Sequence, residues 1–218
     1  MKHYVVNETF GSVQGEGHRA GTPMVFLRFS RCNLRCDDRP GSQEPSDNLV
    51  EQSQRAGFLC DTEFESGRRL SLKQTVDAVL DAAGRGQRFY SWALLTGGEP
   101  ALQADGALRD ALHKAGFQIA IETNGTRQLC GGLDWICVSP KTAEHTIQQL
   151  RAHEVKYVRR HGQGIPQPRC QAEHHFLSPA FQSDGTILRR DLEWCLELVQ
   201  KHAGWRLSTQ DHKFWQVR

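Results

Sequence analysis

The sequence contains no long hydrophobic run. Within its 218 residues there is no stretch of about 18 consecutive apolar residues, the length that a membrane-spanning helix needs. Residues 1–10 also lack the apolar core of about 7–15 residues that marks a secretory signal peptide. We therefore expect a soluble, cytoplasmic protein with no membrane partner.

An excess of charge of one sign is also missing. Lysine and arginine number 27 against 25 for aspartate and glutamate, which leaves a formal net charge of +2. Nucleic-acid-binding proteins draw most of their affinity from basic surfaces, so we expect no nucleic-acid partner. At about 150 residues per domain, the length favours a single domain over residues 1–218.

Cysteine is too sparse for a disulfide scaffold. Seven cysteines are an odd number, and small secreted scaffolds use about 8–10% cysteine. In a reducing compartment, disulfides are rare. Clustered cysteines in such a protein are better tested first as metal ligands.

Short apolar segments alternate with amphipathic ones along most of the chain. This alternation is typical of an α/β fold built on a parallel sheet. We expect strands at 24–29, 92–95, 117–122, 135–138, 155–158, 175–177 and 205–207, and helices at 71–83, 106–115, 143–151 and 188–201. The polar, proline-containing stretch at about residues 37–56 interrupts this pattern, and we interpret it as a surface loop insertion.

Three cysteines follow the first of these strands in the spacing C-x3-C-x23-C: Cys32, Cys36 and Cys60. Three thiolates on one loop can hold three irons of a 4Fe-4S cluster and leave the fourth iron open as a binding site. The same residues are also consistent with unrelated free thiols, or with three of four zinc ligands completed by a histidine.

Two glycine-containing segments are candidate ligand loops. Thr96 to Pro100 (TGGEP) lies at the carboxyl end of a predicted strand, where parallel α/β folds place their sites. Its glycines allow a ligand close to the backbone, and Glu99 could accept a hydrogen bond from an ammonium group. A turn before a helix that begins at Pro100 explains the same residues without a ligand. Gln14 to Gly17 (QGEG) is either a polar turn or a ligand loop.

These segments combine with others in an order that resembles one family. The chain resembles the 7-carboxy-7-deazaguanine synthases, which are radical S-adenosylmethionine enzymes of queuosine and 7-deazapurine biosynthesis. The resemblance runs from about residue 5 to the C-terminus and rests on QGEG at 14–17, Arg28, CNLRC at 32–36, CDT at 60–62, TGGEP at 96–100, IETNG at 121–125, VSPK at 138–141 and WRLSTQDHK at 205–213.

The resemblance implies an abridged (β/α) barrel with three cofactors. The cluster would be held by Cys32, Cys36 and Cys60, and its open iron would chelate S-adenosylmethionine. Magnesium would be held by Thr62, in keeping with the few protein ligands this ion takes. Family contacts to S-adenosylmethionine fall on Leu59, Cys60, Asp61, Gly98, Glu99, Ser139, Pro140, Lys141, Ser178, Pro179, Ala180 and Phe181.

The resemblance also implies a reaction and partners. The substrate would be 6-carboxy-5,6,7,8-tetrahydropterin. Its conversion to 7-carboxy-7-deazaguanine would begin with hydrogen abstraction from C6 by a 5'-deoxyadenosyl radical and would release ammonia, which makes the enzyme a carbon–nitrogen lyase. A reductant protein such as flavodoxin or ferredoxin and a homodimeric assembly are expected. Substrate positions in the family fall on Val13, Gln14, Gly15, Arg28, Thr96 and the terminal carboxylate of Arg218.

Two other functions use the same cysteines. A glycyl-radical-enzyme activase would share the cluster and a TGGEP-like loop, but it gives no reason for QGEG or for the C-terminal motif. A non-catalytic zinc or iron-sulfur protein would use the three cysteines structurally. The remaining four cysteines, which we expect to be structural, are Cys130, Cys137, Cys170 and Cys195.

Overall fold

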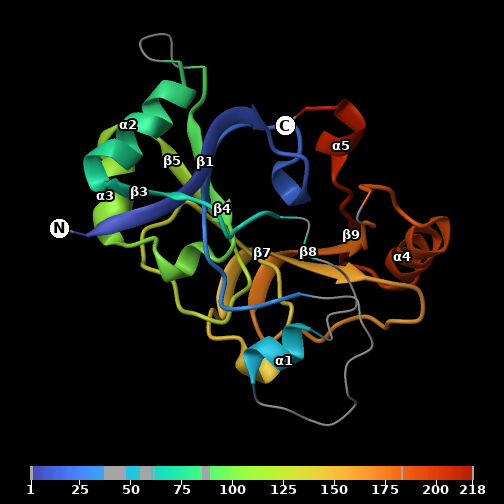
Figure 1. The fold of residues 1–218 in the computed structure, drawn as a ribbon. Coiled ribbons are helices and arrows are strands. Elements are labelled where there is room, and N and C mark those ends of the chain that lie inside the picture. The colour runs from blue at the N-terminus through green and yellow to red at the C-terminus, as the bar shows by residue number, and fades with distance from the viewer. Residues whose placement is uncertain are drawn as a thin grey trace.

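The described part of the chain forms one nine-stranded sheet with its three longer helices on the outer face (Figure 1). The computed structural model describes residues 2–36, 48–54, 60, 62–84, 89–182 and 184–217. The strand order is β3-β1-β2-β4-β5-β6-β7-β8-β9. The strands are β1 (His3–Val13), β2 (Pro23–Phe29), β3 (Arg68–Ser71), β4 (Trp92–Gly97), β5 (Gln118–Thr123), β6 (Trp135–Val138), β7 (Arg151–Arg159), β8 (Gln171–Pro179) and β9 (Trp205–Leu207).

Seven strands, from β2 to β9 in spatial order, run parallel to one another. Strands β1 and β3 extend the sheet in antiparallel pairing. The sheet does not close, since β3 and β9 are its two edges, and this confirms the partial barrel expected from the family resemblance. Because the carboxyl ends of parallel strands share one edge, the loops after β2, β4, β5, β6, β8 and β9 converge there.

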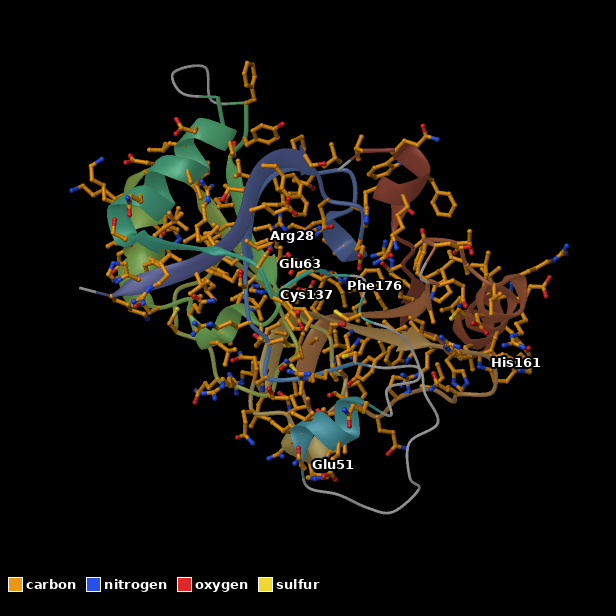
Figure 2. All side chains as sticks on the ribbon, viewed as in Figure 1. Arg28, Glu51, Glu63, Cys137, His161 and Phe176 are labelled. Carbon is orange, nitrogen blue, oxygen red and sulfur yellow. The ribbon has the colours of Figure 1, made fainter. Side chains whose placement is uncertain are left out.

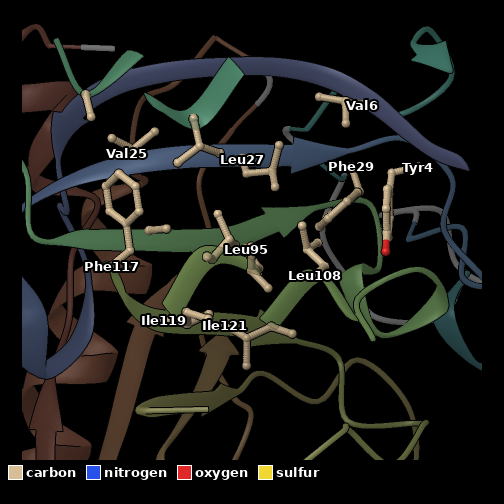
Figure 3. Close-up of a cluster of buried hydrophobic side chains, with 14 residues drawn as sticks. Tyr4, Val6, Val25, Leu27, Phe29, Leu95, Leu108, Phe117, Ile119 and Ile121 are labelled. Atoms are coloured by element: carbon tan, nitrogen blue, oxygen red, sulfur yellow. The ribbon is translucent and has the colours of Figure 1, made fainter. Parts of the chain in front are cut away.

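The largest hydrophobic core lies between the first half of the sheet and helices α2 (Leu72–Ala82) and α3 (Gly106–Lys114) (Figures 1 and 3). Leu27, Leu95 and Ile119 come from three neighbouring strands and are fully buried in it. Ser71 starts α2 with a reciprocal cap, in which its side chain accepts from the Gln74 backbone and its own N–H donates to the Gln74 side chain. Such a cap stabilises a helix by about 1 kcal/mol.

A different helix covers the end of the sheet formed by β8 and β9. Helix α4 (Arg189–Lys201) packs against β8 and β9 around a separate core that includes Val155 and Leu177. On the inner face of the sheet, the Arg19 guanidinium lies between two indoles, 3.8 Å from the Trp92 ring centre and 4.4 Å from that of Trp135. This stack covers the amino ends of β4 and β6, opposite the edge where the loops converge.

The prediction of a helix at 143–151 is wrong. A short 3-10 helix at Glu144–Thr146 is followed by an irregular segment and then by β7, which begins at Arg151. Ile147 is fully buried, and the backbone N–H groups of Gln148 and Gln149 both donate to the Gly125 carbonyl. Tertiary contacts with the loop after β5 therefore replace the helical hydrogen bonds. The other predicted helices and all predicted strands exist, with ends shifted by a few residues.

Part of the predicted insertion at 37–56 is helical. Helix α1 (Leu49–Ser53) is started by Asn48, whose side chain accepts from the backbone of Val50. Residues 37–47 and 55–56 lie outside the described residues. The C-terminal helix α5 (Asp211–Trp215) and strands β1 and β3 were also not predicted. None of the described helices has the length and apolar composition needed to cross a membrane.

Candidate functional site

Two adjoining cavities lie at the edge where the carboxyl ends of the parallel strands converge. The wide cavity has a volume of about 790 Å³ and the inner cavity one of about 200 Å³. Their shared wall includes residues of strands β4 and β5 and of the segments that follow β1, β2, β8 and β9. The residues that line both are Glu16, Cys60, Thr62, Thr96, Glu122, Phe181 and Gln210. Two compartments side by side suit two different bound molecules that must react with each other.

The inner cavity brings the three predicted cluster cysteines together. Cys32 and Cys36 reach it from the loop after β2, and Cys60 reaches it from a segment 24 positions further along the chain. Burial raises the pKa of the Cys32 thiol to about 12 and that of Cys36 to about 11. The thiols are therefore neutral before metal binds, and cluster assembly has to displace their protons.

This cysteine arrangement fits a multi-iron cluster. Among the described residues, no three histidine, cysteine or acidic side chains converge on one point as ligands of a single ion would. A 4Fe-4S cube instead takes one thiolate per iron, so its ligands stand around a space rather than around a point. Cys32, Cys36 and Cys60 all line the inner cavity, as ligands of such a cluster would.

The other walls of the inner cavity come from strand ends. Gly97 ends β4 and Gly98 follows it, Ser139 and Lys141 follow β6, and Ser178 and Pro179 end β8. Gly97 has a φ of 111°, and a Cβ there would lie 2.2 Å from the Phe29 carbonyl oxygen. Only glycine fits this position, which holds the Thr96–Pro100 loop against the cysteine loop.

Glu99 lies behind the cavity wall and lines neither cavity. Its Oε1 accepts from the Thr123 hydroxyl at 2.6 Å and from the Ala101 N–H at 2.9 Å, and its Oε2 accepts from the Asn124 N–H at 2.7 Å. Burial raises the pKa of this carboxyl despite these donors. Glu99 therefore ties the loops after β4 and β5 together in this structure, and its predicted contact with a cofactor stays a prediction.

The remaining predicted cofactor positions fall in three groups. Gly98, Ser139, Lys141, Ser178, Pro179 and Phe181 line the inner cavity. Pro140 and Ala180 are buried next to lining residues without lining a cavity themselves. Leu59 and Asp61 lie outside the described residues, as does the substrate candidate Arg218.

The wide cavity contains most of the predicted substrate positions. Val13, Gln14, Arg28 and Thr96 all line it, as does Glu63, and Figure 2 labels Arg28 and Glu63 near the centre of the view. The Arg28 guanidinium lies 3.4 Å from Glu8, and its buried Nε has no hydrogen-bond partner among the described residues. An arginine in this state has donor capacity left for an anionic ligand.

Of the predicted positions Gly15 and Thr62, only Thr62 lines a cavity. Gly15 lines neither cavity; a Cβ there would lie 2.5 Å from the His212 backbone nitrogen, and its carbonyl accepts from the Asp211 N–H. The glycine thus allows α5 to pack against the QGEG loop, and His212 thereby joins the lining of the wide cavity. Thr62, the predicted magnesium ligand, lines both cavities.

A buried ion-pair network lies between the two cavities. The Lys156 ammonium from β7 contacts the Glu16 carboxylate and lies 3.8 Å from Glu122 Oε1. Gln14 Nε2 donates to Glu122 at 2.8 Å, and Gln210 Nε2 donates to Glu16 at 2.9 Å. The Lys156 side chain is only 7% exposed. One ammonium is therefore shared by two carboxylates in a place with little solvent.

The charged groups of this network have pKa values that are shifted by burial and by one another. Burial alone would lower the pKa of Lys156, but attraction to Glu122 and Glu16 outweighs burial and raises it well above its usual value. Burial raises the pKa of Glu122, and attraction to Lys156 opposes that shift. The lysine is therefore a fixed cation at neutral pH, and it keeps Glu122 closer to its ionised form.

The predicted site residues do not include Glu16, Glu122 or Lys156. Glu16 lies within QGEG and Glu122 within IETNG, so both motifs had been noted without a role for their glutamates. Lys156 carries a weaker signal, a single cation inside the apolar strand segment Val155–Val158. Gln210 and His212 lie in the C-terminal motif and complete the wide cavity.

Comparison with known proteins agrees with this geometry. No protein-family model matches the chain. The 7-carboxy-7-deazaguanine synthase of Bacteroides thetaiotaomicron is 38% identical, over 98% of this chain and 98% of its own. That of Bradyrhizobium diazoefficiens is 36% identical over 99% of each chain. The crystal structure of QueE from Escherichia coli matches with a TM-score of 0.63 at 25% identity, covering 95% of this chain and 93% of its own.

These similarities decide among the three functions that the cysteines allowed. Relatives above 30% identity span nearly the whole chain and carry the name of a single enzyme. The fold resemblance to QueE covers the same extent. The chain therefore belongs to the 7-carboxy-7-deazaguanine synthase family, the radical S-adenosylmethionine lyases of the queuosine pathway that depend on a 4Fe-4S cluster.

Proposed function

We propose that the protein converts 6-carboxy-5,6,7,8-tetrahydropterin to 7-carboxy-7-deazaguanine and ammonia, with the pterin in the wide cavity and S-adenosylmethionine in the inner cavity. The observation that carries this proposal is the pair of adjoining cavities, one lined by three cysteines and the other by an arginine with an unsatisfied donor. When bound, the cluster and S-adenosylmethionine supply the carbon radical that abstracts hydrogen from C6 of the substrate.

The inner cavity is suited to a sulfonium amino acid. Cys32, Cys36 and Cys60 would hold the cluster. The Lys141 ammonium, which donates to Ser139 at 2.6 Å, lines this cavity and is our candidate partner for the carboxylate of the cofactor. Gly98 lines the same cavity, and its backbone is our candidate contact for the amino group.

The wide cavity is suited to a carboxylated pterin. Arg28 offers a guanidinium for the 6-carboxylate, and the bidentate geometry of such a pair fixes the orientation of the ring. The pyrimidine part of a pterin carries several N–H donors. Glu16 and Glu122, which share the Lys156 ammonium and line the same cavity, would accept from these donors.

Thr62 is our candidate protein ligand for magnesium. Thr62 lies in the wall shared by both cavities, two residues after Cys60, and this position supports the assignment. One protein oxygen, completed by substrate oxygens and water, suits an ion that dehydrates reluctantly. We further propose a single domain over residues 1–218 with a surface insertion at about 37–56, a cytoplasmic homodimer, and an electron-carrier protein as the reductant.

The Arg28 assignment can be tested with paired inhibitors. In the unmodified protein, 6-carboxypterin should inhibit more strongly than pterin itself, because only the former carries the carboxylate. Arg28→Gln should reduce that preference about 10- to 100-fold, since a hydrogen bond to a charged group contributes about 1.5–3 kcal/mol. The measurement is the ratio of the two competitive inhibition constants.

The matched control is Arg206→Gln, which changes an exposed arginine that lines neither cavity. It should leave the ratio unchanged. Cleavage of S-adenosylmethionine in the absence of pterin should be the same in all three proteins. An unchanged inhibitor preference in Arg28→Gln would place the substrate carboxylate elsewhere.

A further inference from the structure

Two successive backbone N–H groups directly after Glu16 donate to side chains from distant parts of the chain. The N–H of Gly17 donates to Ser208 Oγ at 2.9 Å. The next one, that of His18, donates to Glu154 Oε2 at 2.7 Å. Ser208 follows β9 and Glu154 lies in β7, so the acceptors are 191 and 136 positions away in the sequence. The conformation of the QGEG loop therefore depends on the second half of the sheet.

Both acceptors are buried and fixed in place. Glu154 is 3% exposed and Ser208 is 5% exposed. The backbone N–H of Ser208 donates to the Leu177 carbonyl of β8, which ties this residue to the sheet. Gly17 has a φ of 67°, and a Cβ there would lie 2.6 Å from Glu154 Oε1. The absence of a side chain at this glycine lets the carboxylate reach the loop backbone.

Glu154 and Ser208 are not among the described residues that line the two cavities, but the residue that they flank lines both. Glu16 Oε1 accepts from Gln210, and its Oε2 contacts the Lys156 ammonium. Lys156 lies two residues after Glu154 in β7, so both side chains leave the same face of the strand. One strand thus holds the loop twice, by its backbone through Glu154 and by the Glu16 carboxylate through Lys156.

The negative charge of Glu154 does not itself favour the site. Burial raises the pKa of Glu122, attraction to Lys156 opposes that shift, and the Glu154 carboxylate adds to the increase. A third carboxylate near a single ammonium therefore works against the ionisation of Glu122. The favourable contribution of Glu154 is its hydrogen bond to the loop, and a neutral amide oxygen can accept such a bond as well.

We infer that Glu154 and Ser208 are positioning residues: by holding the backbone after Glu16, they direct its carboxylate toward the ring amino group of the bound pterin. The inference rests on the proposed function, in which Glu16 accepts from the N–H donors of the pyrimidine ring. Hydrogen bonds weaken steeply when their geometry is lost. A loop displaced by about 1 Å would therefore lose this recognition and leave the carboxylate contact at Arg28 in place.

The test measures recognition of the ring amino group by itself. Reconstituted protein with S-adenosylmethionine is titrated with 6-carboxypterin and with lumazine-6-carboxylic acid, in which a carbonyl oxygen replaces that amino group. The unmodified protein should prefer the pterin. Glu154→Ala and Ser208→Ala should each reduce the ratio of the two dissociation constants about fivefold or more, within the contribution of one hydrogen bond to a charged group. Glu154→Gln and Ser208→Thr keep an acceptor and should keep most of the preference.

A double-mutant cycle separates positioning from a general loss of structure. Glu16→Ala removes the carboxylate that the two residues position and should itself lower the preference. In that background, adding Glu154→Ala or Ser208→Ala should not change the ratio further, because residues that act through one another are non-additive. A merely structural role would weaken the binding of both ligands and leave their ratio unchanged. If Glu154→Ala fails to fold or to retain iron, Ser208→Ala, which removes one uncharged oxygen, decides the question.

Asp191→Ala is the matched control. Asp191 is a fully buried carboxylate in α4 whose Oδ1 accepts from the His161 backbone N–H at 3.0 Å, and it is not a lining residue of either cavity. This variant should be less stable and should keep the ratio. The inference would be overturned by an unchanged ratio in folded Glu154→Ala or Ser208→Ala, by the same reduction with and without the Glu16 carboxylate, or by an equal reduction in Asp191→Ala. Failure of the proposed function looks different, because the unmodified protein itself would then show no preference between the two ligands.

Discussion

Cys36→Ala should leave the protein without its iron-sulfur cluster and without product formation. The remaining ligands, Cys32 and Cys60, would hold two irons, and the inner cavity offers no other described cysteine to replace the third thiolate. After anaerobic reconstitution, iron content should fall from about four per chain to a small residual amount, with loss of the visible absorption near 400 nm.

Cys130→Ala is the matched control. Cys130 is a partly buried free thiol that lines neither of the two cavities described above. It should retain iron, colour and activity. Retention of about four irons by Cys36→Ala would show that the second ligand lies elsewhere in the sequence.

Lys156→Met should also reduce turnover strongly, by changing the charge state of nearby carboxylates rather than by removing the cluster. Without the ammonium, Glu16 and Glu122 face each other as buried like charges, and the pKa of Glu122 rises further. Because our proposal needs the ionised carboxylates, turnover at pH 7 should fall about 100-fold. Raising the pH should recover part of it, because ionisation of Glu122 returns above its raised pKa.

The measurement is the pH dependence of kcat together with an unfolding curve. Loss of one partner from a buried ion pair costs about 3–5 kcal/mol, so a lower free energy of unfolding is also expected. Lys156→Arg keeps the charge and should keep the shape of the pH profile. Lys114→Met, which removes an exposed lysine from α3, should change neither property. A Lys156→Met profile that is lowered uniformly at every pH would contradict the electrostatic role and indicate a structural one.

Sequence patterns correctly predicted those helices and strands whose own residues carry a clear cap, apolar stripe or apolar run. Helix α2 has a capping serine, an apolar stripe and a following glycine, and it forms almost within the expected bounds. Strands β4, β5 and β6 are short, apolar and buried on both faces, and they too were found. The segment at 143–151 had helical propensity and two large apolar residues at helical spacing, Ile147 and Leu150, but Leu150 is exposed in the structure. Burial of Ile147 beneath the loop after β5 determined its conformation.

The site residues also divide into those that local sequence patterns indicate and those that depend on contacts between distant segments. Arg28, Thr96 and the three cysteines lie in motifs at strand ends, and the parallel sheet brings them to one edge. Lys156 could not be found from local sequence, because its partner Glu16 lies 140 residues away and the pair exists only when β7 is aligned with the QGEG loop.

The most direct test of the account is the anaerobic reaction of the reconstituted protein with a reductant, S-adenosylmethionine and 6-carboxy-5,6,7,8-tetrahydropterin. We predict that 7-carboxy-7-deazaguanine and ammonia form in equal amounts over many turnovers, with no matching loss of S-adenosylmethionine. Consumption of S-adenosylmethionine to 5'-deoxyadenosine without the deazapurine acid, by protein that holds about four irons per chain, would contradict the assignment.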